Sequence, residues 1–242
     1  MPSLSIISAN VDSPEWVKLL VKSIRKFTTD MEHEIIIVDN NSMSQNLSWL
    51  KEQGDIKLVL LDKNYGHGEA IDLGTGHARH EFICALDVDA HVQREGWAND
   101  LIDLYNESKE IKFVGCKGPE HKPLKPPLFF YEKSFIVDNA LSFKHIPGIS
   151  SDTAQKLYHD IVNLGFSVER ISPGCKIYKC YGDEFYVDEK PTFYHHWYGT
   201  RFCENRPERK KEELDGYRIE DYLTNKAKLF EEPLVKEILR VK

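Results

Sequence analysis

The stretch that decides the fold of this chain is FICALDVD, residues 82–89. An apolar run of this length that ends in polar residues is typical of a strand buried on both faces of a parallel sheet. In such sheets, ligands bind at the carboxyl ends of the strands. Side chains alternate along an extended segment, so Asp87 and Asp89 share one side and can both address a divalent cation.

Strand and helix patterns alternate throughout the residues before this stretch. Apolar runs predict strands at Leu4–Ala9, Glu34–Val38 and Ile56–Leu61. Helices are expected from Ser13-Pro14 onward, over Leu47–Gln53 up to Gly54, and through Ala70 and Ala78. This alternation predicts an α/β fold, with a Rossmann-like and mostly parallel sheet flanked by helices on both faces. Each predicted strand ends in polar or acidic residues, which places the candidate ligand site at that edge.

The pattern is less regular after residue 90. The segment Cys116–Leu128 is rich in proline and glycine and predicts a mobile loop, while Asp152–Leu164 predicts a helix closed by Gly165. We expect one domain over residues 1–205, with a more regular half at 1–92 and a less regular half at 93–205. Residues 206–242 are densely charged with periodic apolar positions and predict a helical tail docked on the domain.

The bulk properties exclude several classes of protein. The 242 residues carry a formal net charge of −7, which argues against a general nucleic-acid binder. The first apolar run is too short for a signal peptide, and no later segment reaches the length of a membrane span. Five cysteines without disulfide or metal spacing indicate reduced residues. A cytoplasmic protein without a transmembrane segment is therefore expected.

A family resemblance appears along residues 4–92. It is carried by Asn64-Tyr65-Gly66, Ala70, Asp72, Gly74, Ala78, Glu81-Phe82-Ile83 and Leu86-Asp87-Val88-Asp89, and upstream by Ile36-Ile37-Val38-Asp39-Asn40-Asn41-Ser42. These segments, in this order and spacing, resemble the nucleotide-sugar region of the inverting glycosyltransferases of family 2, which have the GT-A fold. The family usually has asparagine at Asp72 and glycine at His80. Ser8 and Ala9 also depart from its first strand, which leaves the donor nucleotide open.

The resemblance implies a nucleotide-sugar donor and a divalent metal, Mn²⁺ or Mg²⁺. It also implies that residues 1–92 are the nucleotide-sugar-binding half and residues 93–205 the acceptor-binding half. The implied donor-binding residues are Ser8, Ala9, Asn10, Asp39, Asn64, Gly66, Asp87, Val88, Asp89 and Arg201. Two carboxylates one residue apart suit these ions, which leave other coordination positions to phosphate oxygens. For Asp39 the alternative role is a cap for the following helix, and Asn64 and Gly66 can equally form a simple turn.

The second half of the chain holds the other candidates. Asp152, followed by Thr153, resembles the family's catalytic base, although with Gln155 it could equally form a capping box. The segment 193–201 resembles the late family segment in which a histidine completes the metal shell. Adjacent histidines point to opposite faces of a strand, so one of the two is the ligand; we favour His196, then His195. Arg201 is a candidate diphosphate contact.

The acceptor is expected to be a carbohydrate or another molecule with a hydroxyl group. Its candidate contacts are Trp97, Phe129, Phe130, Tyr131 and Trp197, for which core packing is the alternative, and Lys117–Leu128 is a candidate lid. Two other functions stay open. Gly66-x-Gly68 before a helix is also found in dinucleotide-binding oxidoreductases, although Ile71 replaces the third glycine. The second open function is that of a non-catalytic carbohydrate-binding module of the same fold.

Overall fold

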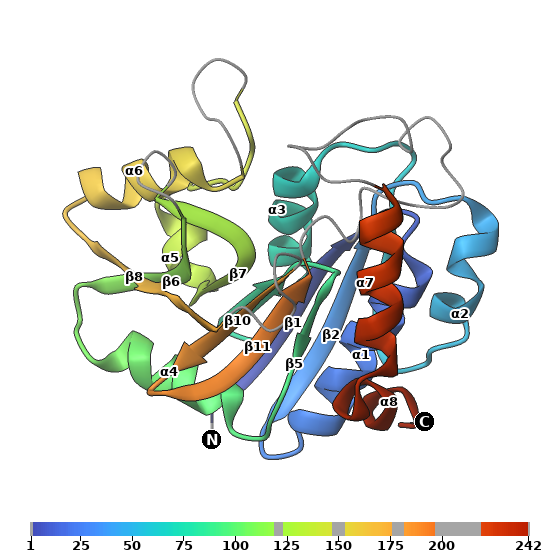
Figure 1. The fold of residues 1–242 in the computed structure, drawn as a ribbon. Helices are drawn as coiled ribbons and strands as arrows, with labels where there is room; N and C mark the ends of the chain where they lie inside the picture. Colours follow the sequence, from blue (N-terminus) through green and yellow to red (C-terminus); the bar gives the residue numbers. More distant parts are fainter. Residues whose placement is uncertain (1, 119–122, 147–152, 176–181, 197–218, 242) are drawn as a thin grey trace.

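The computed structural model describes residues 2–118, 123–146, 153–175, 182–196 and 219–241. Within them, the central feature is a seven-stranded sheet in the order β3-β2-β1-β4-β7-β6-β8 (Figure 1). Its strands are β1 (Ser3–Asn10), β2 (Glu32–Asp39), β3 (Ile56–Leu60), β4 (Phe82–Leu86), β6 (Ile111–Lys117), β7 (Leu124–Glu132) and β8 (Ser167–Ile171). β1 to β4 are mutually parallel, and β7 is antiparallel to both of its neighbours. The predicted mostly parallel sheet is confirmed.

A second, antiparallel sheet in the described part of the chain was not predicted. It runs in the order β5-β11-β10-β9. Its strands are β5 (Ala90–Val92), β9 (Pro173–Cys175), β10 (Gly182–Val187) and β11 (Lys190–His196). Because β5 begins directly after Asp89, this sheet brings the late strands β10 and β11 to the acidic motif, Asp87-Val88-Asp89.

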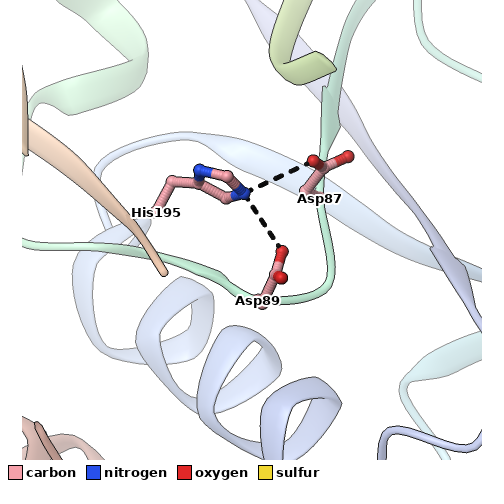
Figure 2. Close-up of side chains that lie close together, drawn as sticks. All are labelled: Asp87, Asp89 and His195. Atoms are coloured by element: carbon pink, nitrogen blue, oxygen red, sulfur yellow. Dashed lines mark ion pairs between the residues drawn. The ribbon is translucent and has the colours of Figure 1, made fainter. Parts of the chain in front are cut away.

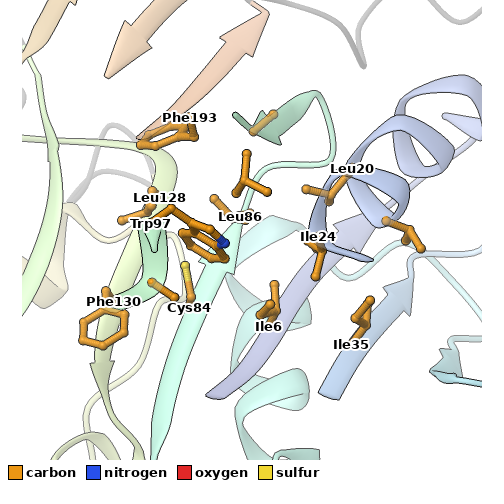
Figure 3. Packing of buried hydrophobic residues seen from close by; sticks show 14 of the residues in the cluster. Ile6, Leu20, Ile24, Ile35, Cys84, Leu86, Trp97, Leu128, Phe130 and Phe193 are labelled. Carbon is orange, nitrogen blue, oxygen red and sulfur yellow. The ribbon is translucent and has the colours of Figure 1, made fainter. Parts of the chain in front are cut away.

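Helices cover both faces of the main sheet, as expected for buried strands. They are α1 (Pro14–Phe27), η1 (Ser44–Leu47), α2 (Ser48–Lys51), α3 (His67–His77), α4 (Trp97–Asn106), α5 (Lys133–Asp138), α6 (Gln155–Asn163), α7 (Ile219–Glu231) and α8 (Pro233–Leu239). One core cluster joins the sheet to α1, α2 and α4, and includes Ile6, Cys84 and Trp97 (Figure 3). The other cluster joins the opposite face to α3, α5 and α6.

The aromatic residues proposed for acceptor binding lie in this core. Trp97, Phe129, Phe130 and Tyr131 each have a relative exposure of 0%. Rings that are fully enclosed cannot stack on a sugar, so the acceptor role is wrong for these four residues, and core packing was the correct alternative. The fifth candidate, Trp197, lies outside the described residues.

The loop expected over Cys116–Leu128 is shorter than predicted. β6 extends to Lys117 and β7 begins at Leu124. The prolines misled the prediction, because Pro126 and Pro127 occur inside β7 where its pairing with β6 shifts register. Proline has no N–H to donate, so it is tolerated at such an irregularity. Of the candidate lid, Lys117 lies in β6 and residues 124–128 lie in β7, while residues 119–122 are outside the described part of the chain.

The described part of the tail packs against α1. Leu229, Val235 and Ile238 are buried in the first core cluster. Lys22 Nζ, on α1, donates a hydrogen bond to the Leu239 carbonyl at 2.9 Å. Figure 1 shows α7 and α8 beside α1, on the side of the molecule away from α6. No helix among the described residues is long and apolar enough to cross a membrane.

Candidate metal and donor site

The acidic motif forms a tight turn at the carboxyl end of β4. The Asp87 N–H donates to the Pro127 carbonyl at 3.1 Å, and the Ala90 N–H donates to the Asp87 carbonyl at 3.0 Å. Val88, between the two aspartates, is buried in the core. Its side chain is therefore not available for the donor contact expected of it. The turn leaves Asp87 and Asp89 free to converge on one point.

His195 joins the two aspartates because of strand register. In the pairing of β5 with β11, His195 lies opposite Ala90, and the His196 N–H donates to the Asp89 carbonyl at 3.0 Å. His195 Nε2 is 3.6 Å from Asp87 Oδ2 and 3.3 Å from Asp89 Oδ1 (Figure 2). One ligand atom from each of these three residues lies within 4.8 Å of the others.

His196 does not join this group, and the preference for it over His195 is corrected. Its ring is fully buried and stacks on Trp16, with ring centroids 4.9 Å apart. Nδ1 is 3.2 Å from the Tyr194 hydroxyl. The expectation that adjacent histidines face opposite sides holds, but the choice between them depended on pairing with β5, which the sequence does not reveal.

The carboxylates and imidazoles of the site shift each other's pKa. Burial acts to lower the pKa of His195, but the charges of Asp89, Asp87 and Asp183 outweigh it and raise the pKa above its usual value. Burial acts to raise the pKa of Asp87, yet His67 and His195 hold it below its usual value. By contrast, burial lowers the pKa of His196 to about 3. The lowered pKa of Asp87 favours its ionised form, which is the form that binds a cation.

His67, the first residue of α3, is a site residue that was not predicted from the sequence. Its Nε2 lies 3.0 Å from Asp87 Oδ1, and its Nδ1 lies 3.3 Å from the Thr153 hydroxyl. A signal was present, because His67 directly follows the Asn-x-Gly turn that the family resemblance placed beside the diphosphate. His67 connects the acidic motif with the second half of the chain.

A second ionic group borders the site on β10. Asp183 lies opposite His195 in the β10–β11 register and is 2% exposed. Lys125 Nζ, from β7, is 3.2 Å from Asp183 Oδ2. The neighbouring Glu184 accepts a hydrogen bond from Gln93 Nε2 at 2.9 Å. Asp183 therefore adds negative charge behind His195, balanced by one lysine.

The predicted nucleoside-binding residues form a buried network at the ends of β1 and β2. Asp39 Oδ1 accepts the Ser42 N–H at 2.8 Å, and Asp39 Oδ2 accepts Asn10 Nδ2 and the Ser42 hydroxyl, each at 2.6 Å. Asp39 thus holds the turn before the short helix η1, close to the capping role left open above. The Ser8 hydroxyl is buried without a hydrogen-bond partner among the described residues.

The Asn-x-Gly turn is tied to the end of β2. Asn64 Oδ1 accepts the Gly66 N–H at 3.0 Å, and Gly66 has φ 108°, which favours glycine. Asn40 Nδ2 donates to the Gly66 carbonyl at 3.1 Å, and the Tyr65 N–H donates to Asn40 Oδ1 at 3.2 Å. The turn role is therefore observed, at the same sheet edge as Asp87.

Gly68 has a packing role. A Cβ at this position would lie 2.2 Å from the Phe143 carbonyl oxygen. The position of the third glycine of a dinucleotide fingerprint is occupied by Ile71, which is buried in the second core cluster. The oxidoreductase alternative therefore loses the glycines on which it rested. Asp152 and Arg201 lie outside the described residues.

Comparisons with known proteins agree with this geometry. The model of glycosyl transferase family 2 matches residues 3–140, which is more than half of the chain. The O-antigen biosynthesis protein RfbC of Myxococcus xanthus is 29% identical over 119 residues, covering 48% of this chain and 9% of the relative. The undecaprenyl-phosphate 4-deoxy-4-formamido-L-arabinose transferase of Proteus mirabilis is 28% identical over 81 residues, covering 31% and 24%. The matches span less than a quarter of either relative.

Solved structures share the fold. The mannosyltransferase PcManGT from Pyrobaculum calidifontis, in complex with GDP-Man and Mn²⁺, has a TM-score of 0.57 and 16% identity, covering 70% of this chain and 54% of that one. Staphylococcus aureus TarS, residues 1–349, has a TM-score of 0.55 and 17% identity, covering 80% and 60%. Both are GT-A glycosyltransferases. With the acidic motif on the GT-A sheet and the family model spanning residues 3–140, this chain belongs to glycosyl transferase family 2.

Proposed function

We propose that this protein is a metal-dependent glycosyltransferase that moves a sugar from a nucleotide-sugar to an acceptor hydroxyl, with inversion at the anomeric carbon. The observation that carries the proposal is the convergence of Asp87, Asp89 and His195 at the carboxyl end of the parallel sheet. Family membership supports glycosyl transfer, and inversion follows from the family resemblance.

The three side chains suit a divalent cation. Two carboxylate oxygens and one imidazole nitrogen are ligands that Mn²⁺ accepts, and so small a set leaves positions for phosphate oxygens. A cation held there would neutralise the negative charge that develops on the departing nucleoside diphosphate. The neighbouring mannosyltransferase structure, described as a complex with GDP-Man and Mn²⁺, supports this class of donor.

Asp152 is the proposed catalytic base, which removes the proton from the acceptor hydroxyl as the new glycosidic bond forms. Support comes from the family resemblance at Asp152-Thr153 and from the residue after it. The Thr153 hydroxyl is 3.3 Å from His67, which is itself 3.0 Å from Asp87. The alternatives to Asp152 are Asp138, Asp183 and Glu184, of which Asp183 and Glu184 have protein partners.

Calorimetry tests the shared metal and donor site. We expect weak Mn²⁺ binding by the protein alone and tighter binding with GDP or UDP present, because the diphosphate would supply the missing ligands. Asp89→Asn should weaken Mn²⁺ binding both without and with the nucleotide. Equal Mn²⁺ affinity with and without each nucleotide would contradict the shared site.

The base is tested by Asp152→Asn. Asparagine caps a helix about as well as aspartate, so the fold should survive. Transfer should fall by roughly 10²- to 10⁴-fold, the usual effect of losing a general base, with nucleotide-sugar affinity nearly unchanged. Near-normal transfer by the variant would rule out Asp152 as the base.

A further inference from the structure

We infer that His67 is a positioning residue of the metal site, which orients Asp87 and links that carboxylate to Thr153 on the acceptor side. The inference rests on the proposed function, since it concerns the same Asp87. The inference goes beyond the proposed function because it gives a structural role to a residue outside the set of metal ligands. The evidence for this role is the position of the two ring nitrogens of His67.

The two oxygens of Asp87 face different partners. Oδ1 is 3.0 Å from His67 Nε2, whereas Oδ2 is 3.6 Å from His195 Nε2. Oδ2 is therefore the oxygen turned toward the cation site, and Oδ1 is held from behind by His67. Among the described residues, the compact group of possible ligands contains Asp87, Asp89 and His195, without His67. Hydrogen bonds of this kind fix the orientation of a metal-binding carboxylate.

The second ring nitrogen of His67 contacts the other half of the chain. Nδ1 is 3.3 Å from the hydroxyl of Thr153, which is 6% exposed. In a neutral imidazole, one nitrogen donates and the other accepts. If the Thr153 hydroxyl donates to Nδ1, the ring proton is on Nε2 and is directed at Asp87. The contact with Thr153 is therefore compatible with the tautomer that donates to Asp87.

Hydrogen bonds of neighbouring residues hold His67 and Thr153 in place. Asp72, one turn further along α3, accepts the Phe143 N–H at 3.0 Å and the Ser142 hydroxyl at 2.6 Å. The Phe143 carbonyl in turn accepts the Ala154 N–H at 3.5 Å, next to Thr153. Gly68 permits the close approach of α3 to Phe143. His67 and Thr153 are therefore fixed relative to each other by adjoining segments.

Two substitutions separate the contacts of His67. The amide nitrogen of glutamine is as many bonds from Cα as Nε2, so His67→Gln can still donate to Asp87 while losing Thr153. The polar atoms of asparagine match Nδ1, so His67→Asn can reach Thr153 but not Asp87. His67→Ala removes both contacts. His77→Gln is the matched control, because His77 is an exposed residue on the same helix.

The experiment is a calorimetric titration of the full chain with Mn²⁺ alone, beside a thermal melt of each variant. His67→Ala and His67→Asn should lose roughly 10- to 100-fold in Mn²⁺ affinity, the usual cost of removing a partner of a ligand, with little change in melting temperature. His67→Gln should retain most of the affinity, and His77→Gln all of it. Thr153→Val should weaken Mn²⁺ binding less than His67→Ala does. Thr153→Ser keeps the hydroxyl and should bind Mn²⁺ as the wild type does.

The outcomes distinguish this inference from the proposed function. Wild-type affinity in His67→Ala would overturn the positioning role and leave the metal site intact. Equal losses in His67→Gln and His67→Ala would also overturn it, since the Asp87 contact would then not matter. A wild-type protein that binds no Mn²⁺, either alone or with GDP or UDP present, would overturn the metal site itself, and this inference with it.

Discussion

His195 and His196 lie on opposite faces of β11 and therefore meet different surroundings. His195 faces three carboxylates, which raise its pKa, whereas His196 is packed on Trp16 in an apolar environment that lowers its pKa. A buried neutral imidazole without nearby carboxylates serves mainly as an aromatic ring. The two histidines thus offer a matched pair for separating metal binding from packing.

Replacing each histidine by phenylalanine tests this division. His195→Phe removes the nitrogen beside Asp87 and Asp89, so Mn²⁺ affinity should fall by more than about tenfold. His196→Phe keeps a ring on Trp16 and loses the hydrogen bond to Tyr194, at a cost of about 1 kcal/mol of stability. Mn²⁺ titration and urea unfolding of both variants check this. Loss of metal binding in His196→Phe, with normal binding in His195→Phe, would reverse the assignment.

Helix α3 is the element that joins the two halves of the site. It carries Gly68, at which a Cβ would lie 2.2 Å from the backbone oxygen of Phe143, and Gly76, at which a Cβ would have no atom within 4 Å. Backbone atoms cannot move aside as a flexible side chain can. The same substitution should therefore have opposite effects at the two positions.

Gly68→Ala should lower the free energy of unfolding by about 1–3 kcal/mol, the usual cost of overpacking. Gly76→Ala should raise it by about 0.5–1 kcal/mol, because alanine is the better helix former in open space. Urea denaturation measures both. If Gly68→Ala were as stable as Gly76→Ala, the close packing of α3 on Phe143 would be wrong.

The tail helices are held by a few buried side chains. Ile238 on α8 is 0% exposed, whereas Leu223 on α7 is 41% exposed. Ile238→Ala should cost about 2–5 kcal/mol, since it leaves a cavity against α1. Leu223→Ala should change stability by less than about 0.5 kcal/mol. Denaturant unfolding of both variants tests whether the tail is an integral part of the fold, and equal small effects would show that it is not.

At the scale of the whole molecule, the sequence predicted local structure well and long-range pairing poorly. Apolar periodicity located β4 at Phe82–Leu86, and β1, β2 and β3 within two residues at each end, but it did not predict the parallel pair β6 and β8. It could not show that β5 pairs with β11, so it could not choose His195. It also missed His67, whose partner Thr153 is far along the chain. Two of the site's contacts therefore come from tertiary structure alone.

The pH dependence of stability is also a property of the whole molecule, and buried histidines should dominate it below neutrality. Burial lowers the pKa of His91 to about 4 and that of His196 to about 3, against about 6.5 for an unfolded chain. Below pH 6.5 these two histidines bind protons in the unfolded chain but stay neutral in the folded protein. Stability from these residues is thus fully present above pH 6.5 and is lost as pH falls toward 4.

Among the other described groups with shifted pKa values, Asp72 has the opposite effect, because burial raises the pKa of its carboxyl and the folded protein then takes up a proton before the unfolded chain does. The pKa of His195 is raised, so its stabilising effect is fully present below 6.5 and is lost only as pH rises through its folded value. The carboxyls of Glu34 and Asp55 have lowered pKa values, so their contribution is lost as pH falls below their ordinary range near 4. In this window His91 and His196 lower the stability as pH falls, and Asp72 opposes them.

We expect the free energy of unfolding to fall with decreasing pH in this window, by about 1.4 kcal/mol per pH unit for each of the two histidines. His91→Phe should remove the contribution of one histidine from the slope, because Nδ1 of His91 has no hydrogen-bond partner among the described residues and an apolar ring can replace it. His77→Gln, which changes an exposed histidine, should leave the slope unchanged. Urea unfolding in EDTA at pH 6.5, 5.5 and 4.5 measures all three proteins. An unchanged slope in His91→Phe would mean that His91 is not held neutral in the fold.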